Sequence, residues 1–361
     1  MDTNTFRRIG HELVDWIAEY RDHIESFPVM SQVRPGEIRA MMPAEPPQRG
    51  LGLDDIAMTL NKIVMPGITH WNHPGFFAYF PANADYSSVL ADIVTAGLGA
   101  QGMSWQTSPA ATEVEEVVMD WLRQMLGLSE SFSGVIQDTA STATFCALLC
   151  ARERATQFCQ NRGGMQAEAS PLVVYASDQA HSSIPKAALL AGFGRDHLRL
   201  LSTDNEHALR LDLLESAIQA DIQAGRRPCA LVAAIGTTAA TALDPLEGMA
   251  ELAARYDMWL HVDAALAGTA MICPEYRWMW KGIERVDSIV LNPHKWMGTG
   301  FDLTAYYVKD PQHLIRVMGT NPELSANSPR RRSKQFQRLG HPLGKAFPLL
   351  ETMVLNSRIR R

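Results

Sequence analysis

One lysine has the setting that covalent chemistry requires. Lys295 follows a short apolar, β-branched run at 288–291 and an Asn-Pro-His break, and it lies between His294 and Trp296. Burial beside aromatic groups lowers the pKa of a lysine and leaves a neutral amine. Such an amine can form a Schiff base with an aldehyde. This segment alone is equally compatible with a surface lysine on a turn, so the rest of the chain decides.

An acid and a small residue follow another apolar run, further upstream. Asp263 ends the run 260–263, and Ala265 comes two residues later. A buried carboxylate is unfavourable unless a positive or hydrogen-bonding group meets it. A carboxylate of this kind keeps the ring nitrogen of pyridoxal phosphate (PLP) protonated, and an alanine leaves room for a flat ring. A capping Asp at a strand-to-helix loop is the simpler alternative.

Two more predicted strands lead to polar groups that suit a phosphorylated ring. A strand at 134–136 precedes Thr139 and a Ser/Thr-rich helix start, whose hydroxyls and backbone N–H groups can bind an anion. Most such starts are only caps, and the Gly-Lys-Ser/Thr of a Walker loop is absent. A strand at 172–175 leads to His181, which could stack on a cofactor ring and act on a substrate, although a lone histidine is more often structural.

Together these segments resemble the PLP-dependent group II amino-acid decarboxylases, most closely the aromatic-L-amino-acid (Dopa/tryptophan) branch in its bacterial form. Several long motifs in one order make a specific signal, and the similarity extends to about residue 321 and returns at 342–344. The matching segments are 292–296 (lysine motif), 261–265 (pyridinium motif), 177–183 (stacking histidine) and the substrate-side segments 66–71, 73–74, 76–81 and 104–109.

The resemblance implies a role for each matching residue. Lys295 would hold PLP, Asp263 would pair with the ring nitrogen, and His181 would stack on the ring and take part in catalysis. The remaining cofactor contacts would be Thr139, Ala140, Ser141, Ala265, Asn292 and His294. The substrate would meet Trp71, Tyr79, Phe80, Ala82, Gln101, Met103, His181 and His294. In that family Gln101 and Met103 reach the partner subunit's site, which implies a homodimer.

The composition and net charge favour an ordinary globular protein over one that binds nucleic acid or a membrane. The 361 residues are 46% hydrophobic and 20% charged, as in an ordinary globular protein. A net charge of −6 gives no reason to expect nucleic acid or a membrane surface as partner, and no apolar run could span a bilayer. Five cysteines without a Cys-x-x-Cys pair, and an early-charged N-terminus, favour reduced thiols in the cytoplasm. No metal site is expected.

Strands and helices alternate from about residue 86 to 307, which predicts an α/β fold with a mostly parallel seven-stranded sheet flanked by helices. By resemblance this is the PLP-dependent transferase fold type I (aspartate aminotransferase-like). Ligands bind beyond the carboxyl ends of such strands. The residues expected there are Thr139, His181, Asp263 and Lys295. Helices are predicted at 87–98, 109–126, 142–160, 183–191, 212–224 and 246–256. Strands are predicted at 134–136, 172–175, 198–201, 230–235, 259–262, 288–291 and 305–308.

The domain prediction has three parts. Residues 1–85 form an N-terminal helical arm and linker, with helices at 6–24 and 54–65, and by resemblance the arm interlocks a dimer. Residues 86–320 form the large PLP-binding α/β domain. Residues 321–361 form the mobile-loop region and the start of a C-terminal domain that is truncated compared with the family.

Three departures from the family pattern keep alternatives open. Ala234 stands where the family has a threonine that contacts the cofactor. No tyrosine follows Asn321-Pro322, where the family's loop carries its proton donor, and general acids of this kind contribute about 10² to 10⁴ in rate. A basic cluster at 330–334 precedes an end at Arg361, short of the family's C-terminal domain.

The main prediction is decarboxylation of aromatic L-amino acids to amines and carbon dioxide. Without the loop tyrosine, oxygen could divert the carbanion and give an aldehyde, so an aromatic aldehyde synthase is the second hypothesis. A truncated, inactive homologue that still dimerises is the third. A dinucleotide-binding enzyme is disfavoured, because Gly192-x-Gly194 lacks its third glycine and follows a helix.

Overall fold

The computed structural model describes residues 1–46, 48, 55–82, 84–102 and 104–319. The chain divides into two compact units, Met1–Asn83 and Ala84–Arg361. The predicted third part, 321–361, lies outside the described residues, as does Met103.

The larger unit contains a seven-stranded sheet in the order β1-β7-β6-β5-β4-β2-β3. Only β7 runs antiparallel to its neighbours β1 and β6, and the other pairs are parallel. The carboxyl ends of the other six strands therefore meet at one edge, as predicted. The strands are β1 (Ser133–Gln137), β2 (Leu172–Ser177), β3 (Leu198–Leu201), β4 (Arg227–Ala234), β5 (Trp259–Asp263), β6 (Ser288–Leu291) and β7 (Thr304–Val308).

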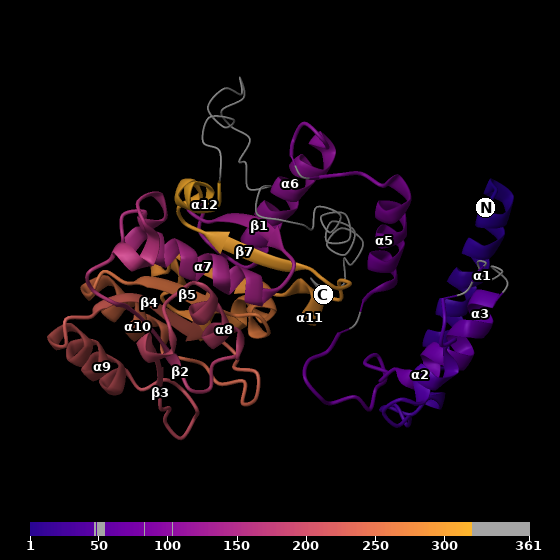
Figure 1. Cartoon of the computed structure of the whole chain (residues 1–361), viewed down its shortest axis with the longest axis horizontal. Coiled ribbons are helices and arrows are strands. Elements are labelled where there is room, and N and C mark those ends of the chain that lie inside the picture. Colours follow the sequence, from indigo (N-terminus) through magenta and orange to yellow (C-terminus); the bar gives the residue numbers. More distant parts are fainter. Residues whose placement is uncertain (47, 49–54, 83, 103, 320–361) are drawn as a thin grey trace. The chain divides into compact units, whose positions relative to one another are not determined.

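Helices cover both faces of this sheet (Figure 1). One face packs against α6 (Pro109–Met125), α9 (Leu211–Gln223) and α10 (Leu246–Arg255). The other packs against α7 (Ala140–Ala155), α8 (Ser183–Leu190) and α12 (Pro311–Met318). A hydrophobic core lies on each face of the sheet, and successive side chains of a strand point to opposite faces. In β2, Tyr175 packs into the core beside α6, α9 and α10, and Val174 packs into the core beside α7, α8 and α12. Both faces are buried, as expected for a parallel sheet.

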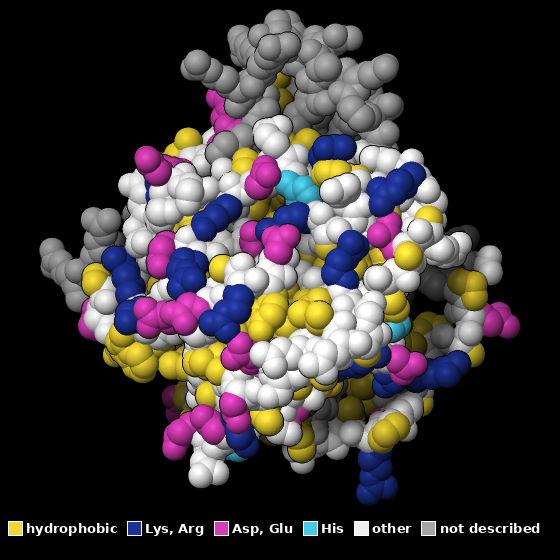
Figure 2. Space-filling view, turned by 90° about the vertical axis from the view of Figure 1, so that its left-hand side faces the viewer, with side chains coloured by type: hydrophobic (Ala, Val, Ile, Leu, Met, Phe, Trp, Pro, Cys, Tyr) yellow, Lys and Arg dark blue, Asp and Glu magenta, His cyan; other side chains and the backbone are white. Residues whose placement is uncertain are grey.

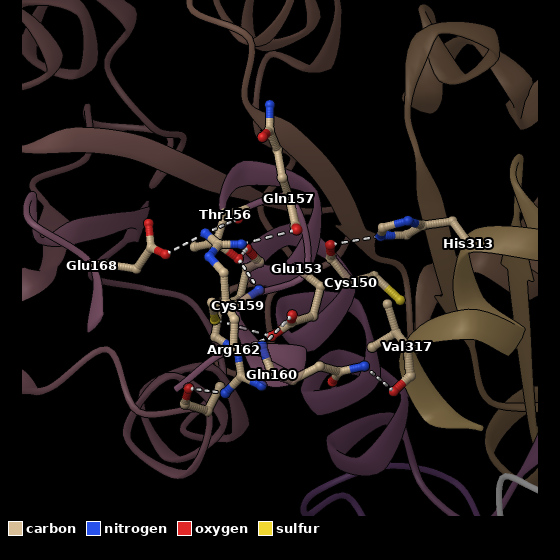
Figure 3. Close-up of polar contacts among 12 residues, drawn as sticks. Cys150, Glu153, Thr156, Gln157, Cys159, Gln160, Arg162, Glu168, His313 and Val317 are labelled. Atoms are coloured by element: carbon tan, nitrogen blue, oxygen red, sulfur yellow. Dashed lines mark hydrogen bonds and ion pairs between the residues drawn. The ribbon is translucent and has the colours of Figure 1, made fainter. Parts of the chain in front are cut away.

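Helix α7 is held at its C-terminal end by a buried carboxylate and by α12 (Figure 3). Glu153 is fully buried and accepts hydrogen bonds from Arg152 Nε (2.8 Å) and the Gln160 backbone N–H (3.1 Å). His313 of α12 donates through Nε2 to Cys150 O (2.9 Å), and Gln160 Nε2 donates to Val317 O (3.2 Å). The helix that follows the predicted anion site is thus fixed at its far end.

Several predicted boundaries were wrong, with clear causes. The 142–160 helix begins at Ala140, because Thr139 caps it by accepting from the Thr142 N–H (3.2 Å). It ends at Ala155, because Gln157 and Phe158 adopt φ values of 53° and 64°. The short helices α11 (Pro293–Trp296) and α12 and the 3₁₀ turns Ala267–Ile272, Pro274–Trp280 and Ile283–Arg285 were not predicted.

The smaller unit is helical. It contains α1 (Thr3–Asp22), α2 (Glu37–Met41), α3 (Asp55–Thr59), a π-helical turn (Leu60–Val64) and α4 (Met65–Gly67). Helix α2 lies in the linker between the predicted helices 6–24 and 54–65, where no helix was predicted. Its start is stabilised by Glu37, whose carboxylate accepts from the Arg34 N–H (2.9 Å).

The surface of the molecule carries charges of both signs. On the face shown in Figure 2, Lys and Arg side chains lie among Asp and Glu side chains, with apolar side chains between them. No helix of the described ranges has the length and apolar character needed to cross a membrane.

Candidate active site

Lys295 lies on the one-turn helix α11, directly after β6. Pro293 occupies the first turn, where its fixed φ suits a helix start, and the Lys295 N–H donates to Asn292 O (2.9 Å). The lysine side chain is half-buried. Burial lowers the pKa of the Lys295 amine, and the negative charge of Asp263 offsets part of that effect. The amine is therefore closer to its neutral, nucleophilic form than that of an exposed lysine.

Asp263 is the last residue of β5, the strand beside β6. Its side chain is 8% exposed, and its Oδ1 accepts a hydrogen bond from the Ala265 N–H (3.1 Å). The backbone ties the two strand ends together, since Ala264 N–H donates to Val290 O (2.9 Å) and Asn292 N–H donates to Ala265 O (3.1 Å). The predicted acid thus ends β5 and the predicted lysine follows β6, and backbone hydrogen bonds join the segments directly after these two strands.

Asn292 is oriented by a residue that the sequence did not reveal. Thr304, the first residue of β7, donates through Oγ1 to Asn292 Oδ1 (2.8 Å). Both side chains are buried, at 0% and 3% exposed. With its carbonyl oxygen occupied, Asn292 keeps its amide NH₂ as a donor for an anion. The signal that could have identified Thr304 is the antiparallel return of β7, which brings its first residue to the carboxyl edge of the sheet.

The start of α7 has the predicted arrangement of an anion site. Thr139 is the N-cap, and the first backbone bond of the helix runs from Ala143 N–H to Thr139 O (3.1 Å). The N–H groups of Ala140 and Ser141 precede that bond and belong to the unsatisfied first turn of a 16-residue helix. Such N–H groups bind phosphate.

The two candidate histidines have different environments. His181 is exposed, and its Nδ1 lies 2.9 Å from Ser183 Oγ and accepts from the Ser183 N–H (3.2 Å). His294 is 5% exposed, and its Nδ1 accepts from the Leu303 N–H (3.0 Å). Burial, and secondarily the charge of Lys295, lowers the pKa of His294 to about 4. His294 is thus neutral at pH 7, with its proton on Nε2.

The predicted substrate residues of the smaller unit form an aromatic cluster. The rings of Trp71 and Tyr79 stack at 5.5 Å with an interplanar angle of 9°, and Phe80 packs edge-on to Trp71 at 5.2 Å. Ala82 is half-buried in the same unit. Gln101 belongs to the larger unit and is exposed.

A buried polar chain beneath the site was also not predicted. Trp259 Nε1 donates to Ser288 Oγ (3.0 Å), Ser288 Oγ lies 2.9 Å from His261 Nδ1, and His261 Nε2 lies 3.3 Å from Thr144 Oγ1. Burial lowers the pKa of His261 to about 3, so this ring is neutral. These hydrogen bonds link β5, which ends at Asp263, to β6, which precedes Lys295, and to α7, which begins at the predicted anion site.

The donors and acceptors at this edge fit PLP. An amine of lowered pKa suits the aldehyde, the Asp263 carboxylate suits the ring nitrogen, and uncharged N–H donors suit the phosphate. Among the residues that the structure describes, no group of three or more His, Cys, Asp and Glu could hold a metal ion. Fold and site together define a fold-type-I PLP enzyme.

Comparison with known proteins gives the family. The pyridoxal-dependent decarboxylase conserved domain matches residues 35–352. The chain is 41% identical to phenylacetaldehyde synthase of Arabidopsis thaliana, over 97% of this chain and 73% of the relative. The chain belongs to the pyridoxal-dependent decarboxylase family, as predicted, and is a PLP-dependent carboxy-lyase.

Two solved structures support the fold over nearly the whole chain. Oryza sativa TDC with PLP and tryptamine has a TM-score of 0.91 and 38% identity, covering 98% of this chain and 74% of that one. Catharanthus roseus tryptophan decarboxylase in complex with L-tryptophan has a TM-score of 0.90 and 38% identity, covering 98% and 75%. The predicted fold class and cofactor are thereby confirmed.

Proposed function

We propose that the protein decarboxylates aromatic L-amino acids to the corresponding amines. The observation that carries the proposal is the placement of Asp263 at the end of β5 and of Lys295 just beyond the end of the neighbouring strand β6, with the lysine pKa lowered by burial. The relative solved with L-tryptophan and the one solved with tryptamine support an aromatic substrate.

Each residue of the site has its own proposed role. When bound, PLP supplies the electron sink for the pair left at the α-carbon as carbon dioxide departs. Lys295 would provide the amine that anchors the aldehyde. Asp263 would hold the proton at the ring nitrogen, and the exposed ring of His181 would stack on the cofactor. The phosphate would accept hydrogen bonds from Ala140, Ser141 and Asn292.

The aromatic cluster supports the choice of substrate. Trp71, Tyr79 and Phe80 offer flat apolar surfaces, with His70 buried next to Trp71 in the sequence. The segment 66–82 contains no arginine or lysine that could pair with an acidic side chain. A flat ring is therefore favoured over a glutamate-like substrate.

A second copy of the chain is the proposed partner, and the cytoplasm the proposed compartment. One side of α5 (Tyr86–Leu98) exposes Leu90, Ile93, Val94 and Leu98 at 52%, 48%, 54% and 67%. A contiguous apolar patch of this kind marks an interaction surface. All five cysteines are free thiols, and four of them are buried, which supports a reducing compartment.

The main test is covalent trapping. Borohydride converts the bond between a lysine amine and the PLP aldehyde into a stable secondary amine, which peptide mass spectrometry should locate at Lys295. Lys295→Ala should abolish the adduct, whereas Lys281→Ala, at a 73% exposed lysine side chain, should leave it intact. Release of carbon dioxide from a panel of aromatic amino acids then identifies the substrate. Absence of any adduct at Lys295 would favour the inactive homologue and overturn the proposal.

An aldehyde synthase remains the second candidate, on one specific observation. No tyrosine follows Tyr307, so the family's loop proton donor has no counterpart here. The similarity to a phenylacetaldehyde synthase supports this alternative. The balanced reaction consumes the amino acid, oxygen and water and yields aldehyde, carbon dioxide, ammonia and hydrogen peroxide. Equal amounts of peroxide and carbon dioxide would establish it, whereas amine alone would exclude it.

A further inference from the structure

We propose that Gln137 is a further cofactor-binding residue, whose side-chain amide donates a hydrogen bond to the phosphate of PLP. The inference deepens the proposed function and depends on it. It assigns a role to a buried side chain that neither the lysine motif nor the acid motif includes.

The first observation is an unsatisfied donor. The Gln137 side chain is 1% exposed, yet its Nε2 has no hydrogen-bond partner within the part of the chain that the structure describes. Buried amide donors in folded proteins are almost always paired. A bound acceptor at this position would remove the unfavourable free energy of the unpaired N–H group.

The second observation is where this donor lies. Gln137 is the last residue of β1 and is the register partner of Thr304 on β7. Partners in an antiparallel pair direct their side chains to the same face, and Val135, two residues earlier, packs into the core beneath α7. Thr304 is the residue that orients Asn292. Gln137 is therefore next to the residue that positions the Asn292 donor.

The third observation is the charge of the surrounding segment. Residues 137–151 contain no lysine or arginine, and Asp138 is the only charged residue among them. The Asp138 carboxylate accepts from the Thr139 N–H (2.7 Å) at the start of α7. A phosphate held here depends on uncharged donors, and each hydrogen bond to a charged acceptor is stronger than one between neutral groups.

The test compares two ligands that differ only in the phosphate. Apoprotein of the full chain is titrated with PLP and with pyridoxal, and binding is followed by quenching of tryptophan fluorescence. Gln137→Met removes the donor at similar volume and should weaken PLP binding about 10-fold or more, with pyridoxal binding unchanged. Gln137→Glu, which places a carboxylate against the phosphate, should weaken PLP binding further and again spare pyridoxal.

Stability of the apoprotein separates a ligand contact from a structural one. Removing an unpaired buried donor should leave the melting temperature of apo Gln137→Met equal to or above that of the parent. The control Gln160→Met removes an exposed amide that donates to Val317 O, so its melting temperature should not rise, and its PLP affinity should stay constant. Equal losses for PLP and pyridoxal in both Gln137 variants, or no loss for either ligand, would overturn the role of Gln137.

The two proposals fail in different ways. If the parent protein neither binds PLP nor shows a borohydride adduct at Lys295, the proposed function itself is wrong. If the parent binds PLP at Lys295 and both Gln137 variants bind it equally well, only the assignment of Gln137 is wrong.

Discussion

Burial shifts the pKa of three basic side chains at the carboxyl edge of the sheet and in the layer below it. It lowers the pKa of the Lys295 amine and of two imidazoles, His294 to about 4 and His261 to about 3. A histidine whose folded-state pKa is depressed contributes stability that is present above its unfolded pKa of about 6.5 and is lost as the pH falls toward the folded value. Both rings therefore favour folding at neutral pH and oppose it in acid.

The pKa of Glu115 is shifted in the direction that makes the folded protein less stable as the pH rises, which can be tested by measuring stability at two pH values. Its carboxylate, 7% exposed, accepts from the Ile136 N–H (2.8 Å) on the edge strand β1. Burial raises its pKa to about 7, the hydrogen bond from Ile136 offsets part of that rise, and the charge of Glu116 adds to it. A raised carboxyl pKa means stability that is full below about pH 4.5 and is lost as the pH rises through about 7.

Glu115→Gln should remove that loss. The amide oxygen can still accept from Ile136, but it carries no charge, so the variant should be more stable than the parent by about 1 to 3 kcal/mol at about pH 8. At about pH 4 the two proteins should unfold at the same urea concentration. The exposed Glu130→Gln is the matched control and should show no difference at either pH. A Glu115→Gln variant equal to the parent at both values would contradict the assignment.

Single residues differ in how far the sequence could predict them. Lys295, Asp263 and Asn292 lie in contiguous segments after strands, so their positions at the sheet edge followed from the pattern. The positions of Thr304 and Gln137 near the site depend on strand register, which pairs residues far apart in the sequence. No spacing rule within one segment could have revealed that pairing.

At the scale of elements, the polar chain Trp259–Ser288–His261–Thr144 joins α7 to two strands. Ser288→Ala should leave Trp259 Nε1 and His261 Nδ1 without their shared partner and reduce the free energy of unfolding by about 1 to 3 kcal/mol. Urea denaturation of the parent and the variant measures this difference.

Ser216→Ala is the matched control for that change. Ser216 is exposed and donates to Asp212 O (2.8 Å) within α9, so its loss should change stability by less than about 0.5 kcal/mol. If Ser288→Ala behaves like this control, the polar chain does not stabilise the contact between α7 and the sheet.

Element length explains which boundaries were predicted. Strands β3 and β6 were predicted to the residue, because apolar runs end abruptly at polar or turn-forming neighbours. Helices α2, α11 and α12 span 5, 4 and 8 residues. Such lengths hold too few turns for a 3.6-residue period to be recognised. The end of α7 depended on positive φ values at non-glycine residues, which composition does not specify.

At the scale of the whole molecule, the apolar side of α5 makes the proposed dimer testable. Leu90→Glu combined with Val94→Glu should place two charges in the interface and convert the dimer to monomer, as measured by analytical ultracentrifugation. Leu190→Glu, at a 75% exposed leucine of α8, is the control and should leave the mass unchanged. A parent protein that sediments as a monomer, or a double variant that remains dimeric, would contradict the assignment of α5.

The segment that connects β6 to β7 begins and ends at two residues that are hydrogen-bonded to each other. It leaves the sheet at Asn292, carries Lys295, and returns at Thr304, and the two end residues are joined by a side-chain hydrogen bond. The reach of the lysine is therefore fixed by the number of residues in the connection as well as by their identity. Insertions and deletions should be selected against here, even at positions whose side chains tolerate exchange, and a designer who grafts new loops onto this scaffold should keep this connection at its present length.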